Sequence, residues 1–328
     1  MGVKFKDITT PEELNIKKLN SKIVTIDASN IIYQFLSSVR QADGTPLKDL
    51  NGNITSHLNG IMFQTATLID FGIKPVYVFD GKAPELKHKT QQKRIESKKK
   101  SEEEYEKAKK EGDQERAKKY ASRVVHLNKE IISSSKKLLG LMGVPYVQAP
   151  SEGEAQASYM VKQKDAWAVV SQDYDCLQFG ATRMIRNLTI TQKRNRSLEM
   201  ISLEKTLNEL GITREQLIDV AILVGTDFND GIYNVGAKRG LKLIKKHQTL
   251  EKVLKHLDKT LEVEPEILQN IFLKPNVTDD YKLQWNKPDK ERILDFLCGE
   301  HDFTEERTLS AIKKIQNQTS QTTLEQWF

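Results

Sequence analysis

Acidic residues follow several short apolar runs of the sequence, and their placement indicates chemistry. The runs at 22–26 and 75–79 end directly in a carboxylate, and the run at 166–170 leads to two more. Because the carboxyl ends of parallel strands form the ligand crevice of open α/β sheets, we expect these side chains to converge on one side of a sheet. The seven candidates are Asp27, Asp80, Glu152, Glu154, Asp173, Asp175 and Asp227.

Seven clustered carboxylates repel one another unless a positive group lies among them. Mg²⁺ takes oxygen ligands of this kind and keeps much of its water. The two cysteines and six histidines are scattered, without the spacing of a site for a softer metal. Two divalent ions about 4 Å apart activate water and stabilise the leaving oxygen in phosphodiester cleavage. The pattern therefore indicates metal-dependent hydrolysis of phosphodiester bonds.

Single members of this set also have a plainer interpretation. A lone Asp after a strand, such as Asp27, is more often a turn or capping residue than a functional one. Ser151 and Glu154 have the spacing of a capping box, and spacing alone favours this interpretation for Glu154. Asp173 and Asp175 are stronger candidates, because residues i and i+2 of an extended segment face the same way. Only the repetition along the chain supports one shared site.

The elements that must position these acids form an alternating pattern of strand-like and helix-like runs, which is typical of α/β folds. Strands are expected at 22–26, 75–79, 144–147, 166–170 and 184–190, and helices at 31–39, 56–71, 151–163 and 214–223. We therefore predict one domain over residues 1–315, with a central, mostly parallel sheet and helices on both faces. The polar composition after residue 315 predicts a flexible tail at 316–328.

Positive charge is concentrated in one segment. The 328 residues include 51 basic and 45 acidic side chains, a net charge of +6, but residues 81–137 alone hold 18 basic and 10 acidic side chains. A cationic segment on a slightly acidic body suits a polyanion better than a small metabolite, with a solvated helical hairpin as the alternative. The longest apolar runs are far short of the roughly 20 residues of a membrane span. We expect an intracellular protein without a membrane partner.

The basic segment is expected to form two helices. Residues 96–104 contain no strongly apolar side chain, so a helix there has no stripe to bury against a core. Gly112 offers a break, after which apolar residues from Tyr120 to Ile131 resume a helical spacing. The first helix should therefore project from the body of the protein.

The glycine-containing stretch at 231–240 is a second candidate for phosphate binding. It approaches a P-loop, but Ala237 breaks the required Gly-Lys-[Ser/Thr]. A hairpin between helices is a better account, in which the main-chain N–H groups around Gly231 and Gly236, with Lys238 and Arg239, hold a DNA phosphate without reading sequence. An ordinary glycine-containing turn between helices is the alternative.

Six short stretches form an ordered set of motifs. They are Thr25-Ile-Asp27-Ala-Ser, Ile32-Tyr33-Gln-Phe-Leu, Tyr77-Val-Phe-Asp80-Gly-Lys, Ala149-Pro-Ser-Glu152-Gly-Glu154-Ala, Gln172-Asp173-Tyr-Asp175-Cys-Leu and Gly225-Thr-Asp227-Phe. With these six motifs in this order, the sequence resembles the archaeal and eukaryotic flap endonuclease family over essentially its whole length. The resemblance implies a PIN-like 5′ nuclease that removes 5′ flaps from branched DNA in replication and repair, with 5′–3′ exonuclease activity. It implies two Mg²⁺ ions, or Mn²⁺ in their place, held by all seven acids, and for Glu154 it replaces the capping interpretation.

The same resemblance implies roles for other residues. Lys87 and Arg94 match a basic pair that reaches the scissile phosphate from a helical arch, here at about 82–137. Tyr33 matches an aromatic residue that stacks on the base next to the cut, although an apolar helix face alone would make it a core residue. Arg40 is a further predicted DNA contact.

The glycine-containing hairpin resembles the family's helix–two-turn–helix, here at about 216–247, which holds the downstream duplex and commonly a K⁺ ion. Asn234 replaces the usual Gly and Ala237 the usual Pro. Because Asn tolerates a left-handed backbone, we expect the turn to be kept. The stretch at 51–53 is less acidic than in eukaryotic members, so a preference for double-flap substrates is not predicted.

The last residues of the chain resemble a sliding-clamp-binding peptide. Gln321, Leu324, Trp327 and Phe328 have the spacing i, i+3, i+6 and i+7. A stray hydrophobic end is the alternative, but two aromatics after a polar linker would be exposed without a partner. We therefore expect a monomeric flap endonuclease docked on the clamp. The alternatives are a related 5′ nuclease that prefers gaps or junctions, and a non-catalytic, clamp-tethered DNA-binding scaffold.

Overall fold

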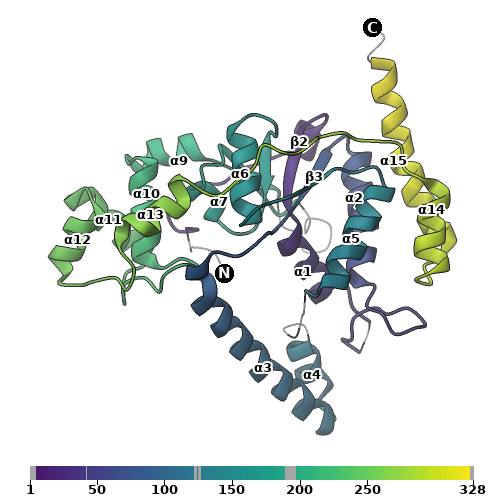
Figure 1. The fold of residues 1–328 in the computed structure, drawn as a ribbon, viewed down its shortest axis with the longest axis horizontal. Helices are drawn as coiled ribbons and strands as arrows, with labels where there is room; N and C mark the ends of the chain where they lie inside the picture. The colour runs from purple at the N-terminus through teal and green to yellow at the C-terminus, as the bar shows by residue number, and fades with distance from the viewer. Residues whose placement is uncertain (1–4, 42, 122–123, 125–126, 189–196, 326–328) are drawn as a thin grey trace.

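A computed structural model describes residues 5–41, 43–121, 124, 127–188 and 197–325, with side chains to residue 317 (Figure 1). Seven strands in these residues form one sheet in the order β1-β7-β6-β5-β2-β3-β4. The strands are β1 Glu12–Glu13, β2 Ile23–Asp27, β3 Lys74–Phe79, β4 Tyr146–Gln148, β5 Ala168–Val170, β6 Arg183–Arg186 and β7 Glu199–Ser202. β5 pairs in parallel with β6 and β2, and β3 pairs in parallel with β2 and β4, whereas β7 pairs antiparallel with β6 and β1. The predicted, mostly parallel α/β sheet is confirmed.

Helices cover both faces of this sheet, as predicted (Figure 1). The face that Tyr77 and Phe79 of β3 point toward packs against one set of helices, and the face of Val76 and Val78 packs against the other, as the period of two along a strand requires. The first set contains α1 Ala28–Ser38, α2 Ser56–Asp70, α5 Lys129–Leu141, α14 Lys290–Leu294 and α15 Glu305–Glu325. The second contains α6 Gly153–Lys162, α7 Asp175–Gln178, α9 Leu203–Leu210, α10 Arg214–Val224, α11 Ala237–His247, α12 Leu250–Leu257 and α13 Pro265–Leu273.

The basic segment forms a projecting pair of helices, α3 His88–Lys110 and α4 Gln114–Ala121, which we call the arch (Figure 1). Gly112 lies between them with φ +73°, so the predicted break is confirmed. Inside α3 only the small side chains of Ser101 and Ala108 are buried, as expected for a helix without an apolar stripe.

The second helix of the basic segment is shorter than its apolar spacing predicts. Val124 and Leu127 lie outside α4, and a separate helix, α5, follows. Asn128 caps α5, because its side chain accepts a hydrogen bond from the N–H of Ile131 at 2.8 Å. The side chain of an N-cap Asn bonds to the first turn of the helix that follows it, and this favours a new helix start over continuation of the preceding helix. Tyr120 and Ile131, which share one helical spacing, therefore lie in separate helices, α4 and α5.

Other predicted boundaries also shift. The strand expected at 184–190 ends at Arg186, where its pairing with β7 ends. The backbone of α15 is helical to Glu325, beyond residue 315, where the composition predicts a flexible tail. Among the described residues no helix is long and apolar enough to cross a membrane.

Candidate active site

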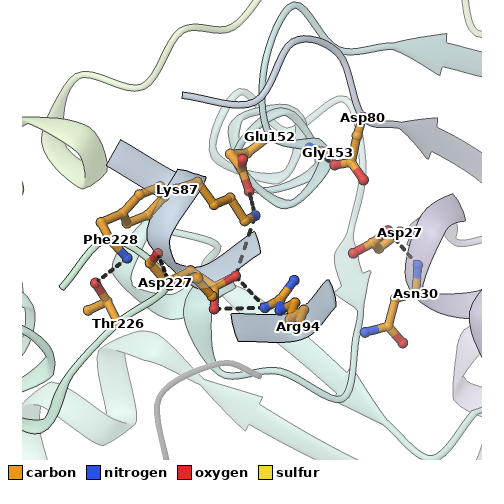
Figure 2. Close-up of polar contacts among 11 residues, drawn as sticks. Asp27, Asn30, Asp80, Lys87, Arg94, Glu152, Gly153, Thr226, Asp227 and Phe228 are labelled. Carbon is orange, nitrogen blue, oxygen red and sulfur yellow. Dashed lines mark hydrogen bonds and ion pairs between the residues drawn. The ribbon is translucent and has the colours of Figure 1, made fainter. Parts of the chain in front are cut away.

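The first two acids lie at the ends of neighbouring parallel strands. Asp27 ends β2 and caps α1, because its carboxylate accepts the N–H of Asn30 at 3.0 Å. Asp80 follows β3 and accepts the N–H of Gly153 at 2.6 Å (Figure 2). The capping interpretation of Asp27 is thus correct, but its carboxylate also lies within reach of the other acids.

The next two acids lie at the beginning of α6. Glu152 is the N-cap residue and Glu154 lies in the first turn, so the capping box of Ser151 and Glu154 is wrong. Glu154 is instead half-buried, and its carboxylate accepts a hydrogen bond from the hydroxyl of Ser171 at 3.0 Å. A helix N-terminus favours negative charge, which suits both acids.

Asp173 and Asp175 follow β5, as expected. Asp175 is the first residue of α7 and is buried. The carboxylate of Asp173 accepts a hydrogen bond from the side-chain amide of Asn30 at 3.2 Å. The ends of β2 and β5, which pair in parallel, are therefore joined through these side chains.

The carboxylates perturb one another's protonation. Burial, followed by the negative charges of Asp80 and Asp173, raises the pKa of Asp27 to about 8. Burial, followed by the charges of Asp175 and Asp27, raises the pKa of Glu154 well above its usual range. Carboxylates from four segments of the chain therefore form one cluster, in which negative charge exceeds what the neutral donors compensate.

Within the described part of the chain, the cluster lacks the compact geometry of a preformed site for one metal ion. No three His, Cys, Asp or Glu side chains among the described residues are arranged to coordinate a single ion. The donors are nevertheless all carboxylate oxygens, and their mutual repulsion is what a hard divalent cation would relieve. Mg²⁺ binds commonly through one or two carboxylates and several waters, so a looser cluster than a zinc site fits it.

Two basic side chains of the arch segment contact this cluster (Figure 2). The ammonium group of Lys87 forms an ion pair with Glu152 and lies 3.4 Å from a carboxylate oxygen of Asp227. The guanidinium of Arg94 donates to both oxygens of Asp227, at 2.8 and 2.7 Å. Burial alone would lower the pKa of Lys87, but the neighbouring carboxylates outweigh it and raise the pKa. The predicted basic pair thus lies directly on the predicted acids.

Asp227 itself lies in a tight loop after α10. Gly225 and Gly231 close this loop with positive φ angles of +104° and +72°. A Cβ at Gly231 would lie 2.5 Å from the main-chain N of Gly225, so only glycine fits there. Within the loop, the hydroxyl of Thr226 accepts the N–H of Phe228 at 3.0 Å. Gly231 therefore shapes the loop that carries Asp227.

The segment at about 216–247, for which the resemblance implies a helix–two-turn–helix, contains α10 and α11 joined by a turn. Asn234 adopts the left-handed conformation, with φ +61°, so the expectation that Asn keeps the turn is confirmed. Gly236 is the N-cap residue of α11, and Lys238 and Arg239 are exposed in its first turn. Arg239 also donates to the main-chain oxygen of Asn234 at 3.1 Å.

Two further predicted contacts lie near the arch. Tyr33 is 37 % exposed, so its interpretation as a core residue is wrong, and the ammonium of Lys98 lies 5.8 Å from the centre of its ring. Arg40 donates to the main-chain oxygens of Ser37 and Gly44, at 3.2 and 2.8 Å. In this structure Arg40 therefore stabilises a turn. Trp327 and Phe328 lie outside the described residues, and Gln321 and Leu324 lie one helical turn apart in α15.

Sequence reasoning missed the neutral donors of the site. Asn30, Ser171 and the N–H of Gly153 all bond to acids of the cluster. Asn30 lies three residues after Asp27 and Ser171 two residues before Asp173, which are spacings of ordinary turns and caps. The sequence signal for Asn30 and Ser171 is their position close to an acid, and this position does not distinguish functional residues from ordinary turn and cap residues.

Comparison with known proteins agrees with this arrangement. Residues 1–101 match the XPG N-terminal domain and residues 143–227 match the XPG I-region. The two matched regions carry all seven acids, so the fold and the site define a nuclease of the XPG class.

Individual relatives narrow this class. The chain is 67 % identical to flap endonuclease 1 of Methanosphaera stadtmanae over 328 residues and 48 % identical to that of Pyrococcus furiosus, and each alignment covers 100 % of this chain and at least 99 % of the relative. The solved flap endonuclease-1 of Methanococcus jannaschii superposes with a TM-score of 0.80 at 43 % identity, covering 98 % of this chain and 100 % of that one. The catalytic core of Rad2, solved with a DNA substrate, shares the fold with a TM-score of 0.75 at 23 % identity, over 96 % of this chain and 100 % of that one. The chain belongs to the flap endonuclease 1 family and is a structure-specific 5′ flap nuclease.

Proposed function

We propose that this protein cuts branched DNA at the base of a 5′ flap by two-metal hydrolysis, and that it also has 5′–3′ exonuclease activity. The observation that carries this proposal is the pairing of Lys87 and Arg94 with Glu152 and Asp227. Cationic groups of a projecting segment lie here on an oxygen-rich acidic cluster. A scissile phosphate needs both partners, because metal ions and cationic side chains stabilise different parts of its developing charge.

The acids at the sheet edge would hold two Mg²⁺ ions, or Mn²⁺ in their place. When bound, the metal supplies a water of lowered pKa and stabilises the leaving oxygen. Lys87 and Arg94 then exchange their carboxylate partners for the phosphate and neutralise charge that develops on it. Arg94 presents two donors in a fixed fork, which fits phosphate as well as carboxylate.

The duplex beside the flap is held by the helix–two-turn–helix. Lys238 and Arg239 are exposed, and Gly236, the N-cap residue of α11, has no side chain that could cap the first turn, which suits a phosphate at this helix N-terminus. Tyr33, exposed on α1, would stack on the base next to the cut. A K⁺ ion at the hairpin and Arg40 as a DNA contact remain parts of this proposal.

The C-terminal peptide would dock a monomeric enzyme on the sliding clamp in replication and repair, at the nucleoid. The spacing of Gln321, Leu324, Trp327 and Phe328 supports this partner. A short helical turn brings the apolar members of such a set together, which suits insertion into an apolar pocket.

The test is single-turnover cleavage of an end-labelled 5′-flap duplex in Mg²⁺ and in Ca²⁺, with a 3′ flap and a four-way junction as controls. We expect cutting near the flap base in Mg²⁺ only, and Asp173→Asn should abolish it while DNA binding is kept. Preference for the junction would assign the protein to a related 5′ nuclease activity. Tight binding without cutting would make it a scaffold, and near-normal cutting by Asp173→Asn would contradict the metal assignment.

A further inference from the structure

We propose that Ser171 and Asn30 are positioning residues that hold Asp173 at a fixed place between Glu154 and Asp27. This inference rests on the proposed metal-dependent function. It concerns two neutral side chains that touch acids of the site and carry no charge themselves.

Ser171 joins two acids through one hydroxyl group. Its side chain is 4 % exposed, and its hydroxyl donates to a carboxylate oxygen of Glu154 at 3.0 Å. The same oxygen accepts the main-chain N–H of Asp173 at 3.1 Å. A hydroxyl has one proton to donate and lone pairs to accept, so both bonds form together. Ser171 therefore ties the first turn of α6 to the segment after β5.

Asn30 joins the carboxylate of Asp173 to α1. Its side-chain amide donates to an oxygen of Asp173 at 3.2 Å, while its main-chain N–H donates to Asp27 at 3.0 Å. The second bond is an ordinary helix cap and does not depend on the side chain. The first bond serves no helix, and it reaches across 143 positions of the sequence. Loss of the bond between Asn30 and Asp173 should therefore affect the acid cluster and leave α1 unchanged.

The two tethers face the same small space. Asn30 and Ser171 line, together with Asp27, a cavity of about 10 Å³. Asp27 and Asn30 lie at the junction of β2 and α1, and Ser171 follows the neighbouring strand β5, so the two bonds to Asp173 come from adjacent strand ends. Donors of this kind orient carboxylates that would otherwise turn away from one another by repulsion, and their loss typically costs 10–100-fold in metal affinity.

The experiment measures Mn²⁺ binding to the full chain without DNA, by electron paramagnetic resonance of the free ion. We expect Ser171→Ala to raise the Mn²⁺ dissociation constant about tenfold and Ser171→Thr, which keeps the hydroxyl, to restore it. Ser158→Ala is the matched control, because the hydroxyl of this buried serine donates to the main-chain oxygens of Glu154 and Cys176, at 2.6 and 3.3 Å. It should leave the dissociation constant unchanged within a factor of two.

A second variant protects the test against loss of folding. Asn30 is half-buried, and Asn30→Ala keeps the helix cap while removing the bond to Asp173. It should also raise the Mn²⁺ dissociation constant, and with Ser171→Ala the two effects should be less than additive because both act on Asp173. In cleavage assays the Mg²⁺ concentration for half-maximal rate should rise, while the rate at saturating Mg²⁺ stays close to that of the unchanged protein.

Two results would overturn this inference in different ways. Equal dissociation constants for Ser171→Ala, Asn30→Ala and the unchanged chain would refute the positioning role, as would an equal shift in Ser158→Ala. Absence of saturable Mn²⁺ binding by the unchanged chain would refute the proposed metal site itself.

Discussion

Replacement of Lys87 by Ala should have opposite effects on metal binding and on cleavage. In this structure the ammonium of Lys87 pairs with Glu152 and lies 3.4 Å from Asp227, and its side chain is only 15 % exposed. It thus occupies the place where a divalent cation would meet these acids. A cation that binds there must displace it, so Lys87→Ala should bind Mn²⁺ more tightly than the unchanged chain.

The size of this effect follows from the pair's electrostatics. Two unit charges 3.4 Å apart attract by roughly 1 kcal/mol in water and by roughly 5 kcal/mol at an effective dielectric of 20. Most of that attraction offsets the cost of removing both groups from water. A net cost of about 1.4 kcal/mol for displacement is reasonable, and it corresponds to about tenfold tighter Mn²⁺ binding in the variant. Cleavage should change the other way, and loss of one donor to developing charge slows the chemical step by about 100-fold or more.

The assay combines Mn²⁺ titration without DNA and single-turnover cleavage of a 5′ flap in saturating Mg²⁺. Lys89→Ala is the control, because Lys89 also lies at the base of the arch and also pairs with an acid, Glu262. Unlike Lys87, Lys89 is largely exposed, with 64 % of its side chain accessible. Lys89→Ala should change neither the Mn²⁺ dissociation constant nor the cleavage rate by more than about twofold, because an exposed ion pair contributes little free energy. Weaker or unchanged Mn²⁺ binding in Lys87→Ala would refute the competition, and an unchanged cleavage rate would reduce the arch to an electrostatic guide.

Three further predictions concern the hairpin, a buried histidine and the tail. Gly231→Ala should lower the free energy of unfolding in urea by more than about 1 kcal/mol, because its Cβ meets the backbone at positive φ, whereas Gly236→Ala, whose Cβ meets no atom within 4 Å, should cost less; equal costs would contradict this account. Burial, followed by the charge of His301, lowers the pKa of His57 to about 4, so the stability that it contributes is complete above pH 6.5 and decreases as the pH falls toward 4. Between pH 7 and pH 5, His57→Gln should therefore lose about 2 kcal/mol less stability than the unchanged chain, and an equal loss would mean that folding leaves the pKa of His57 at its ordinary value. Deletion of residues 321–328 should remove stimulation by the sliding clamp and keep basal cutting, and a truncated protein that the clamp still stimulates would reveal a second docking surface.

The acids could be predicted because their positions depend on local rules. A parallel strand buried on both faces has a continuous apolar run, and the residue that follows it lies at the crevice by construction. Asp27 and Asp80 obey this rule at the ends of β2 and β3. The alternation along β3, with Tyr77 toward one face and Val78 toward the other, also follows from strand geometry alone.

The capping box at α6 could not be judged from spacing. Ser151 and Glu154 have the required separation, but the N-cap is Glu152, so the helix begins one residue later than that pattern assumes. The reason lies outside the segment, since Asp80 accepts the N–H of Gly153 and Ser171 donates to Glu154. Groups distant in sequence satisfy the helix terminus and its acid, and such partners carry no local signature.

The short strands β1 and β7 and the exposure of Tyr33 share this cause. A strand of two residues such as β1 exists only because β7 pairs with it, and its sequence has no run long enough to recognise. Tyr33 follows an apolar helical spacing, but no element of the described chain packs fully over its ring, and its partner across the sequence, Lys98 of α3, carries no local signature.

Asp227 differs from the other acids in how it is held, and this difference bears on mechanism. Both oxygens of its carboxylate accept hydrogen bonds from one guanidinium nitrogen of Arg94, and its main-chain oxygen accepts the hydroxyl of Thr90 at 2.8 Å. Both partners belong to α3, whereas Asp173 is held by Asn30 from α1. Any displacement of α3 must therefore break these bonds or carry the loop of Asp227 with it. A DNA phosphate that attracts Arg94 would therefore compete with the carboxylate of Asp227 for the same guanidinium.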